Sequence, residues 1–306
     1  MSRCLATSAA AQEIPVFEHE RDMYVSPGQS GSIWSGPLLL RYEDTMTDSP
    51  LVEAIDRDLN RDRIPFEIPG ASKIQILRLG AGADGSILVG GNAFSRDSRR
   101  AGFIAWITPD RKGRTLIQTE PFRPQTVVMS SDGVIWAAGH LWDGVDGRHN
   151  TFNIIRRYDK TGILLSTLNV KNAICDPRLM GDGDADSASR LLASKDRVGW
   201  LTSGYEYIEF SLDGEIRDRF AGPHGPEITG LSGWGMSQDN QIVLDMEKGS
   251  NSYVVVLDRR TRTWIPLPIP GHKTPGWVQI IGFDGTTLIV FDQGTVERYK
   301  PAGNTR

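Results

Sequence analysis

Residues 130–139 read SSDGVIWAAG and indicate a repeat, because a related segment, GADGSILVGG, occupies residues 82–91. In both stretches Asp-Gly precedes a run of apolar residues. Glycine tolerates the positive φ of a tight turn, so Asp-Gly between two apolar runs predicts a β-hairpin. Weaker copies lie at residues 194–204, 237–246 and 282–291. The aspartates of the five copies are Asp84, Asp132, Asp196, Asp239 and Asp284, at spacings of 48, 64, 43 and 45 residues.

A second hairpin follows four of these copies. Residues 106–118, 157–168, 209–220 and 256–267 each contain a β-type run, a polar turn with an aspartate, and another run. Each unit therefore carries four short strands in up-and-down order. Four-stranded units of about 45 residues are typical of propeller blades.

The N-terminal region supplies a further blade, because VEAIDRDLNRDRIPFEIPG at residues 52–70 matches VVVLDRRTRTWIPLPIPG at residues 254–271. We expect its first two strands within residues 23–40, around a turn at residues 28–31. The last blade lacks a fourth strand, and the Ile-Pro pattern recurs at Ile14 and Pro15, so residues 14–19 are expected to supply it. The expected fold is an all-β, single six-bladed β-propeller of four-stranded antiparallel blades, closed by an N-terminal strand. The expected blades are 23–70, 74–121, 124–169, 188–222, 228–270 and 275–303.

Outside the repeats, the sequence divides into three parts. Residues 1–12 read as a truncated signal or a disordered N-terminus, residues 13–303 form the propeller, and residues 170–188 are an insertion loop that explains the 64-residue spacing. Ala9-Ala10-Ala11 has the small-x-small pattern of a signal-peptidase site, although a full apolar core is missing. This favours a bacterial-type secreted protein, periplasmic or extracellular, and leaves a cytoplasmic one open. Cleavage after Ala11 would leave Cys175 without an intrachain partner.

Charge and hydropathy exclude two classes of partner. The 34 Lys and Arg residues against 38 Asp and Glu give a net charge of -4, and the sequence shows no basic patch of the kind that nucleic-acid binding requires. The sequence also contains no apolar run approaching the roughly 20 residues of a membrane span. We expect a monomer that binds a small ligand, a glycan or a protein.

The aligned repeat resembles the six-bladed propellers of the NHL and streptogramin-lyase types, whose repeat has a D-G-x-[IL]-W core. The resemblance covers most of the chain at the level of the fold. In streptogramin lyases a Phe-Thr-Glu-like run follows the Trp, whereas Ala137-Ala138-Gly139 follows Trp136 here. Gluconolactonase-type propellers open with a Glu-Gly-Pro metal signature, whereas this chain has Gly28-Gln29-Ser30-Gly31. The resemblance therefore implies the fold without either family's catalytic residues.

Candidate site residues gather in the loops between second and third strands and between successive blades. Four of the five histidines fall there: His140, His149, His224 and His272. Loops on a rigid scaffold often carry function. A converging pair of histidines would suit acid–base chemistry or metal binding, and surface histidines without a role remain the alternative.

The loop at residues 139–150 is the richest of these. Besides His140 and His149 it offers Trp142, Asp143, Asp146 and Arg148. Trp142 would form a stacking floor for a ring or sugar, or else pack against a neighbouring blade. Arg96, Arg99 and Arg100 project from the preceding blade and would clamp an anionic ligand, or else serve solubility alone.

Metal and nucleophile motifs are incomplete. Asp182, Asp184 and Asp186 resemble the start of a calcium loop, but Ser187 and Ala193 replace the Gly and Glu of an EF-hand. A looser Ca²⁺ or Mg²⁺ site and an acidic loop both remain open, and no other cofactor is indicated. Neither Ser203 nor Ser232 lies in a G-x-S-x-G elbow. Trp34, Trp136 and Trp200 are expected to pack between blades.

The sequence thus leaves two functions open. The first is a non-catalytic binding propeller. The second is a metal-dependent propeller hydrolase or lyase, with the four loop histidines and Glu247 as ligands or acid–base groups. Whether the protein is an enzyme depends on whether these side chains converge.

Overall fold

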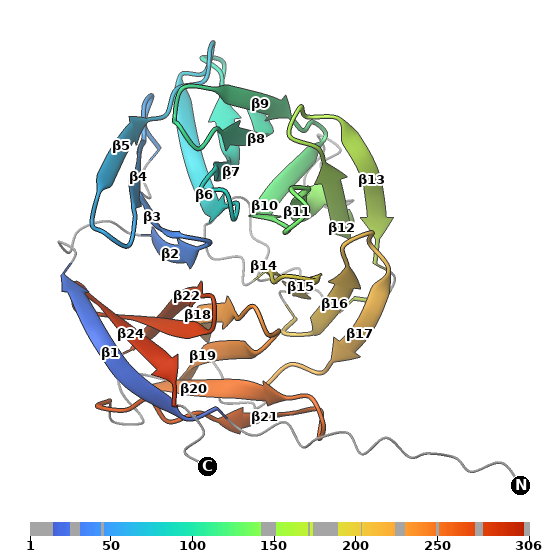
Figure 1. The fold of residues 1–306 in the computed structure, drawn as a ribbon. Helices are drawn as coiled ribbons and strands as arrows, with labels where there is room; N and C mark the ends of the chain where they lie inside the picture. The colour runs from blue at the N-terminus through green and yellow to red at the C-terminus, as the bar shows by residue number, and fades with distance from the viewer. Residues whose placement is uncertain are drawn as a thin grey trace, which may run out of the picture.

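The strands form a ring of sheets around a central axis (Figure 1). The computed structural model describes residues 15–24, 31–43, 46–141, 151–170, 172–173, 189–202, 204–223, 230–248, 251–272 and 278–302. These residues contain 24 strands and no helix. In this part of the chain, accordingly, no helix has the length and apolar character needed to cross a membrane.

Four of the sheets each consist of four consecutive antiparallel strands. Their bounds are β6 (Lys73–Ala81), β7 (Ile87–Phe94), β8 (Arg100–Ile107) and β9 (Arg114–Gln118); β10 (Phe122–Met129), β11 (Ile135–Leu141), β12 (Thr151–Tyr158) and β13 (Leu164–Asn169); β14 (Arg190–Ala193), β15 (Arg197–Leu201), β16 (Tyr207–Ser211) and β17 (Ile216–Phe220); and β18 (Gly230–Met236), β19 (Ile242–Lys248), β20 (Asn251–Asp258) and β21 (Thr263–Pro266). The first strand of each sheet lies nearest the axis and the fourth lies outermost (Figure 1). The up-and-down order that the repeat predicts is confirmed.

The fifth sheet has eight strands in the order β1-β24-β23-β22-β2-β3-β4-β5. Its strands are β1 (Phe17–Tyr24), β2 (Gly31–Ser35), β3 (Leu38–Tyr42), β4 (Leu51–Ile55), β5 (Arg61–Pro65), β22 (Gln279–Asp284), β23 (Thr287–Asp292) and β24 (Thr295–Pro301). Its two halves meet at one parallel bridge, between Trp34 and Gly282.

The N-terminal strand lies beside the C-terminal strand, as the Ile-Pro pattern predicts. β1 pairs antiparallel with β24, from Phe17 opposite Pro301 to Tyr24 opposite Thr295. The strand covers residues 17–24 rather than 14–19, and Ile14 lies outside the described residues. The side chains of Phe17 and Met23 are buried at 2% and 4% exposure, and they anchor β1 to the sheets beneath.

The prediction for the first two strands of the N-terminal blade is wrong. Met23 belongs to β1, where it lies opposite Val296. The first hairpin of that unit joins β2 to β3 through a turn at Gly36. This residue has a φ of 55°, a conformation that glycine adopts with little strain. The apolar side chain of Met23 packs with Ile289 and Val296, so the residue belongs to the closing strand.

The Asp-Gly turns form as predicted, and the aspartate side chains stabilise them. The Asp84 carboxylate accepts a hydrogen bond of 3.0 Å from the backbone N–H of Ser86, and Gly85 takes a φ of 79°. Burial works to raise the pKa of Asp84, but hydrogen bonds from Ser86 and Lys160 outweigh it and lower that pKa to about 2.

Large aromatic side chains fill the space between neighbouring sheets. Trp136 and Trp200 are almost fully buried in one cluster, in which the ring of Trp136 lies 6.0 Å from that of Phe210. Trp34 is likewise buried at 3% exposure, between β1, β3 and β22. The predicted packing role of the three tryptophans is confirmed.

Candidate functional site

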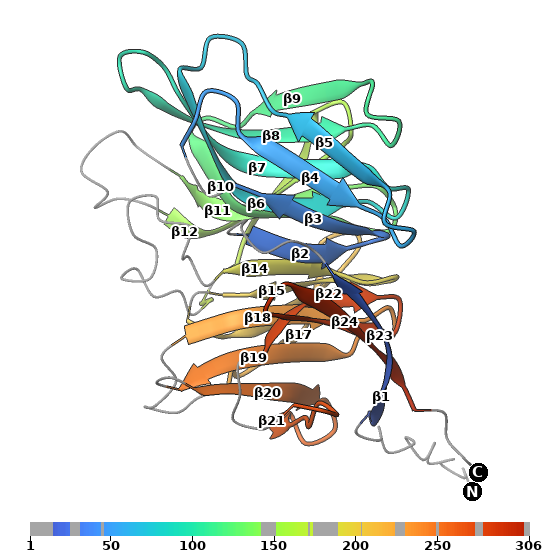
Figure 2. The same ribbon diagram turned by 90° about the vertical axis from the view of Figure 1, so that its left-hand side faces the viewer.

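The ring has two ends, and the connections of each sheet divide between them. Turns between the first and second strands and between the third and fourth lie at one end, called the turn face here. Connections between the second and third strands lie at the other, called the loop face. Figure 2 shows the two ends in profile, on either side of the strands.

Most of the predicted site residues lie outside the described part of the chain. These are Trp142, Asp143, Asp146, Arg148, His149, Asp182, Asp184, Asp186 and His224. The described ones are His140, Glu247, His272 and the arginines at positions 96, 99 and 100.

The two described histidines of the predicted set, His140 and His272, occupy different parts of the ring. His140 lies in β11 opposite Arg123, with 8% of its surface exposed. His272 lies 2.5 Å from the Glu297 carboxylate, which also accepts a hydrogen bond of 2.6 Å from the Tyr299 hydroxyl on β24. Burial, and then the Glu297 carboxylate, raise the pKa of Tyr299. The contacts of His272 therefore place it against an outer part of the ring, whereas His140 belongs to another sheet.

Glu247 lies in β19, in a third sheet, opposite Gly230 and Ser252. Within the described residues no three His, Cys, Asp or Glu side chains are grouped closely enough to hold a metal ion. The described members of the predicted set are thus not brought together.

The arginines form an ordered loop, called the Arg loop here, between β7 and β8. The backbone N–H of Ser95 donates to the carbonyl of Arg99 at 2.9 Å, and the Arg99 guanidinium lies 2.9 Å from the Asp97 carboxylate. The Arg100 guanidinium lies 5.9 Å from the centre of the Phe94 ring. Arg96 and Arg99 are exposed at the tip of this loop.

A buried carboxyl group that the sequence analysis missed lies in β19. Asp245 is fully buried, and it accepts hydrogen bonds from the Ser232 hydroxyl at 2.7 Å and from the Ser252 hydroxyl. Burial raises the pKa of Asp245 to about 6, and the charge of Glu247 adds to this shift. The only signal in the sequence is one aspartate within the apolar run IVLDM at residues 242–246.

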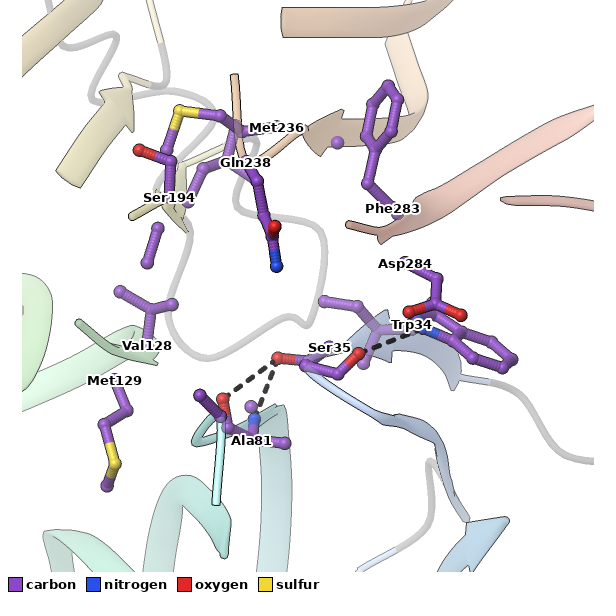
Figure 3. Close-up of a pocket in the computed structure, with 18 of the residues that line it drawn as sticks. Trp34, Ser35, Ala81, Val128, Met129, Ser194, Met236, Gln238, Phe283 and Asp284 are labelled. Carbon is purple, nitrogen blue, oxygen red and sulfur yellow. Dashed lines mark hydrogen bonds between the residues drawn. The ribbon is translucent and has the colours of Figure 1, made fainter. Parts of the chain in front are cut away.

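A cavity of about 540 Å³ lies on the axis (Figure 3), lined by residues at the turn-face ends of the first strands and in the turns that follow them. We call it the channel cavity. Its lining includes Val128, Met129, Leu192, Met236 and Phe283, which come from four first strands. These residues keep only 6–8% exposure and belong to the core clusters between sheets, and Figure 3 shows the side chains of Met129 and Phe283 pointing away from the cavity.

Polar groups complete the lining. The Gln238 amide points into the cavity, and its backbone N–H is held by the carbonyl of Gly285 at 2.9 Å (Figure 3). The Ser35 hydroxyl accepts a hydrogen bond of 2.8 Å from the backbone N–H of Ala81 and so ties two neighbouring first strands together. Asp284 is paired with Arg57, and with Arg298 at 2.8 Å.

The sequence predicts the turns around this cavity but not the cavity itself. Its lining comes from seven separated turns and strand ends, which meet only when the ring forms. The repeat pattern gives no measure of the space left on the axis.

The comparisons with known proteins bear on the fold. No protein-family model and no curated protein matches the chain. Among solved structures, one of BBS1N in complex with ARL6DN, soaked with mercury, matches with a TM-score of 0.50 and 13% identity, covering 90% of this chain and 78% of that one. A structure of a nidogen/laminin complex matches with a TM-score of 0.50 and 10% identity, covering 83% and 85%. Together with the ring of four-stranded sheets, these likenesses show an all-β propeller fold.

Proposed function

We propose that the protein is a non-catalytic binding propeller that docks a partner protein on its loop face. The observation that carries the proposal is the propeller fold shared with two structures that were each solved as a complex of two proteins. The exposed Arg loop supports the choice of face, because arginine is well suited to pairing with acidic groups at interfaces. A glycan or a small ligand on the same face is the other occupant to test.

The proposal includes six blades of the NHL-like type. Counting the eight-stranded sheet as two blades is supported by the single bridge between its two halves and by the pairing of β1 with β24.

The proposal also includes export to the periplasm or beyond and a monomeric state. Cell fractionation of the full chain tests export, and light scattering tests for a mass of 33.8 kDa in solution.

A charge-reversal pair tests the docking face. Arg96→Glu changes an exposed arginine on the loop face, and Arg260→Glu makes the same change at an exposed turn on the turn face. The full chain is cross-linked to its partners in its native cells, and the captured proteins are quantified by mass spectrometry. We expect Arg96→Glu to reduce the capture of one defined protein at least about tenfold, as for an interface hot spot, and Arg260→Glu to leave it unchanged. Equal capture by both variants, or loss only in Arg260→Glu, would contradict the proposed face.

A bound Ca²⁺ or Mg²⁺, with Asp182, Asp184 and Asp186 as candidate ligands, remains part of the proposal. These residues lie outside the described part of the chain. Melting of chelator-treated protein with each ion tests it. At about 100 times its dissociation constant, a bound ion stabilises by about 2.7 kcal/mol. The ion-dependent rise in Tm should disappear when the three aspartates are changed to asparagine.

A further inference from the structure

We propose that the outer edge of β13 is a docking site for an extended, uncharged segment of a partner protein, which adds to the sheet as a fifth strand. β13 is the last strand in the order β10-β11-β12-β13, so one edge of its backbone has no strand beside it among the described residues. Such an edge presents a row of N–H and C=O groups that can pair with an added strand. This goes beyond the docking proposed above, because β13 lies at the outer rim of the ring and not on the loop face (Figure 1).

The composition of β13 differs from that of the other outer strands. Proteins commonly protect outer strands with charged side chains, with proline or by keeping them short. Among the described outer strands, β1 and β17 carry several charged side chains, and β5 carries three charges and Pro65. β9 begins with Arg114, and β21 has only four residues and ends at Pro266. β13 reads LLSTLN over six residues, with no charge and no proline, so none of these devices keeps an added strand away from its edge.

Exposed apolar side chains lie at the start of this edge. Ile163, Leu164 and Leu165 are exposed over 63%, 46% and 48% of their surface. Runs of three or more exposed apolar residues are unfavourable in water unless they serve a function. The pairing of β13 with β12 shifts its register next to Leu165 and is regular from Ser166 to Asn169. A strand that pairs with the regular part and continues past it removes the three apolar side chains from water.

The charges of the neighbouring strand favour an uncharged segment. Arg156 and Arg157 of β12 pair in the ladder with β13. The Arg156 guanidinium lies 4.8 Å from the centre of the Phe122 ring of β10, and the Arg157 guanidinium lies 4.8 Å from that of the Trp136 ring of β11. Both side chains therefore extend toward the inner strands and away from the outer edge. A charged segment would lose hydration against this edge without meeting a counter-charge, which costs free energy.

The test measures the binding of a peptide to the full chain by fluorescence anisotropy. The peptide alternates valine and threonine, has blocked ends, and carries a fluorophore on a polyethylene glycol linker. We expect one peptide to bind per protein. Leu164→Lys places a charge at the edge and should weaken the binding at least about tenfold with an unchanged Tm. Tyr24→Lys places the same charge on β1, at a residue that is 72% exposed, and should leave the affinity unchanged. If Leu164→Lys lowers the Tm, Thr167→Lys, at another exposed position of β13, takes its place.

A second peptide separates strand pairing from contact between apolar side chains. It has the same sequence with a methyl group on every backbone nitrogen, so it cannot donate to a ladder, and it should bind at least about tenfold more weakly. Equal binding of the two peptides would overturn the proposal, as would no binding to the wild type or unchanged affinity in the β13 variants. Self-association of the full chain that Leu164→Lys abolishes, measured by light scattering, would assign the edge to a second copy of this chain instead. No loop-face partner enters the assay, so its result is independent of the docking proposal.

Discussion

At the scale of single residues, the most informative group is the buried carboxyl of Asp245. Its pKa is raised from 3.8 to about 6 because burial disfavours the charged form. The folded protein therefore holds this proton more tightly than the unfolded chain does. The stability that the group contributes is fully present below about pH 4 and is lost as the pH rises through 6. A shift of this size corresponds to about 3 kcal/mol.

Asp245→Asn should remove this pH dependence, because the amide carries no charge to bury. We expect the variant to be more stable than the wild type at pH 8, by up to about 3 kcal/mol, and to lose that advantage by pH 4. Urea unfolding at pH 4, 6 and 8 measures the difference. Asp239→Asn is the control, since Asp239 is exposed in the neighbouring turn and should show no such change. A pH-independent difference between Asp245→Asn and wild type would refute the assignment.

Leu59 offers a second prediction at the scale of one residue. It has a φ of 66° in the β4–β5 turn, and its side chain is 54% exposed. A left-handed backbone costs a leucine roughly 1–2 kcal/mol. Leu59→Gly should therefore stabilise the protein by up to about 1 kcal/mol after the entropy of glycine is subtracted. Leu165→Gly, at an exposed strand position, should instead destabilise it by roughly 0.5–1 kcal/mol. Thermal melting that ranks the two variants in the opposite order would contradict this.

At the scale of the element, β1 is held by a backbone ladder and by two side chains. Its other side chains are exposed, so Phe17 and Met23 supply most of its burial. Phe17→Ala should lower stability by roughly 3–5 kcal/mol, as for other buried aromatic residues. Val16→Ala, next to it and exposed, should change stability by less than about 0.5 kcal/mol. Similar melting temperatures for the two variants would mean that β1 contributes little to the ring.

At the scale of the whole molecule, the ring depends on close approach of first strands. A Cβ at Gly282, where φ is 142°, would lie 2.3 Å from the carbonyl oxygen of Trp34. Gly271 also has a positive φ, 83°, but has open space around it. Gly282→Ala should therefore cost well beyond the roughly 1–2 kcal/mol of backbone strain expected for Gly271→Ala. Equal losses, measured by urea unfolding, would show that the approach of β2 to β22 is not tight.

The sequence predicts the fold where the pattern is local. Asp84 and Asp132 each precede a glycine, and that dipeptide alone specifies a turn, so the strands around them are predicted well. The end of β1 is not predicted by a local pattern. Met23 belongs to this strand because its side chain packs against Ile289 and Val296, more than 260 residues away in the sequence. The channel cavity and the burial of Asp245 depend on the distances between sheets, which no repeat pattern contains. The predicted histidines share a loop class, yet His140 lies in β11, whereas His272 lies between β21 and β22 and contacts Glu297 of β24.

The register of β1 on β24 also determines how the protein responds to force. The start of β1 lies opposite the end of β24, at the Phe17–Pro301 pair. A load applied between the two chain ends therefore acts on this pair first. The hydrogen bonds between β1 and β24 then break one after another, because the load does not act on all of them at once. Tension through both termini would peel β1 away and expose the edge of β24, while the four separate sheets would bear none of that load directly.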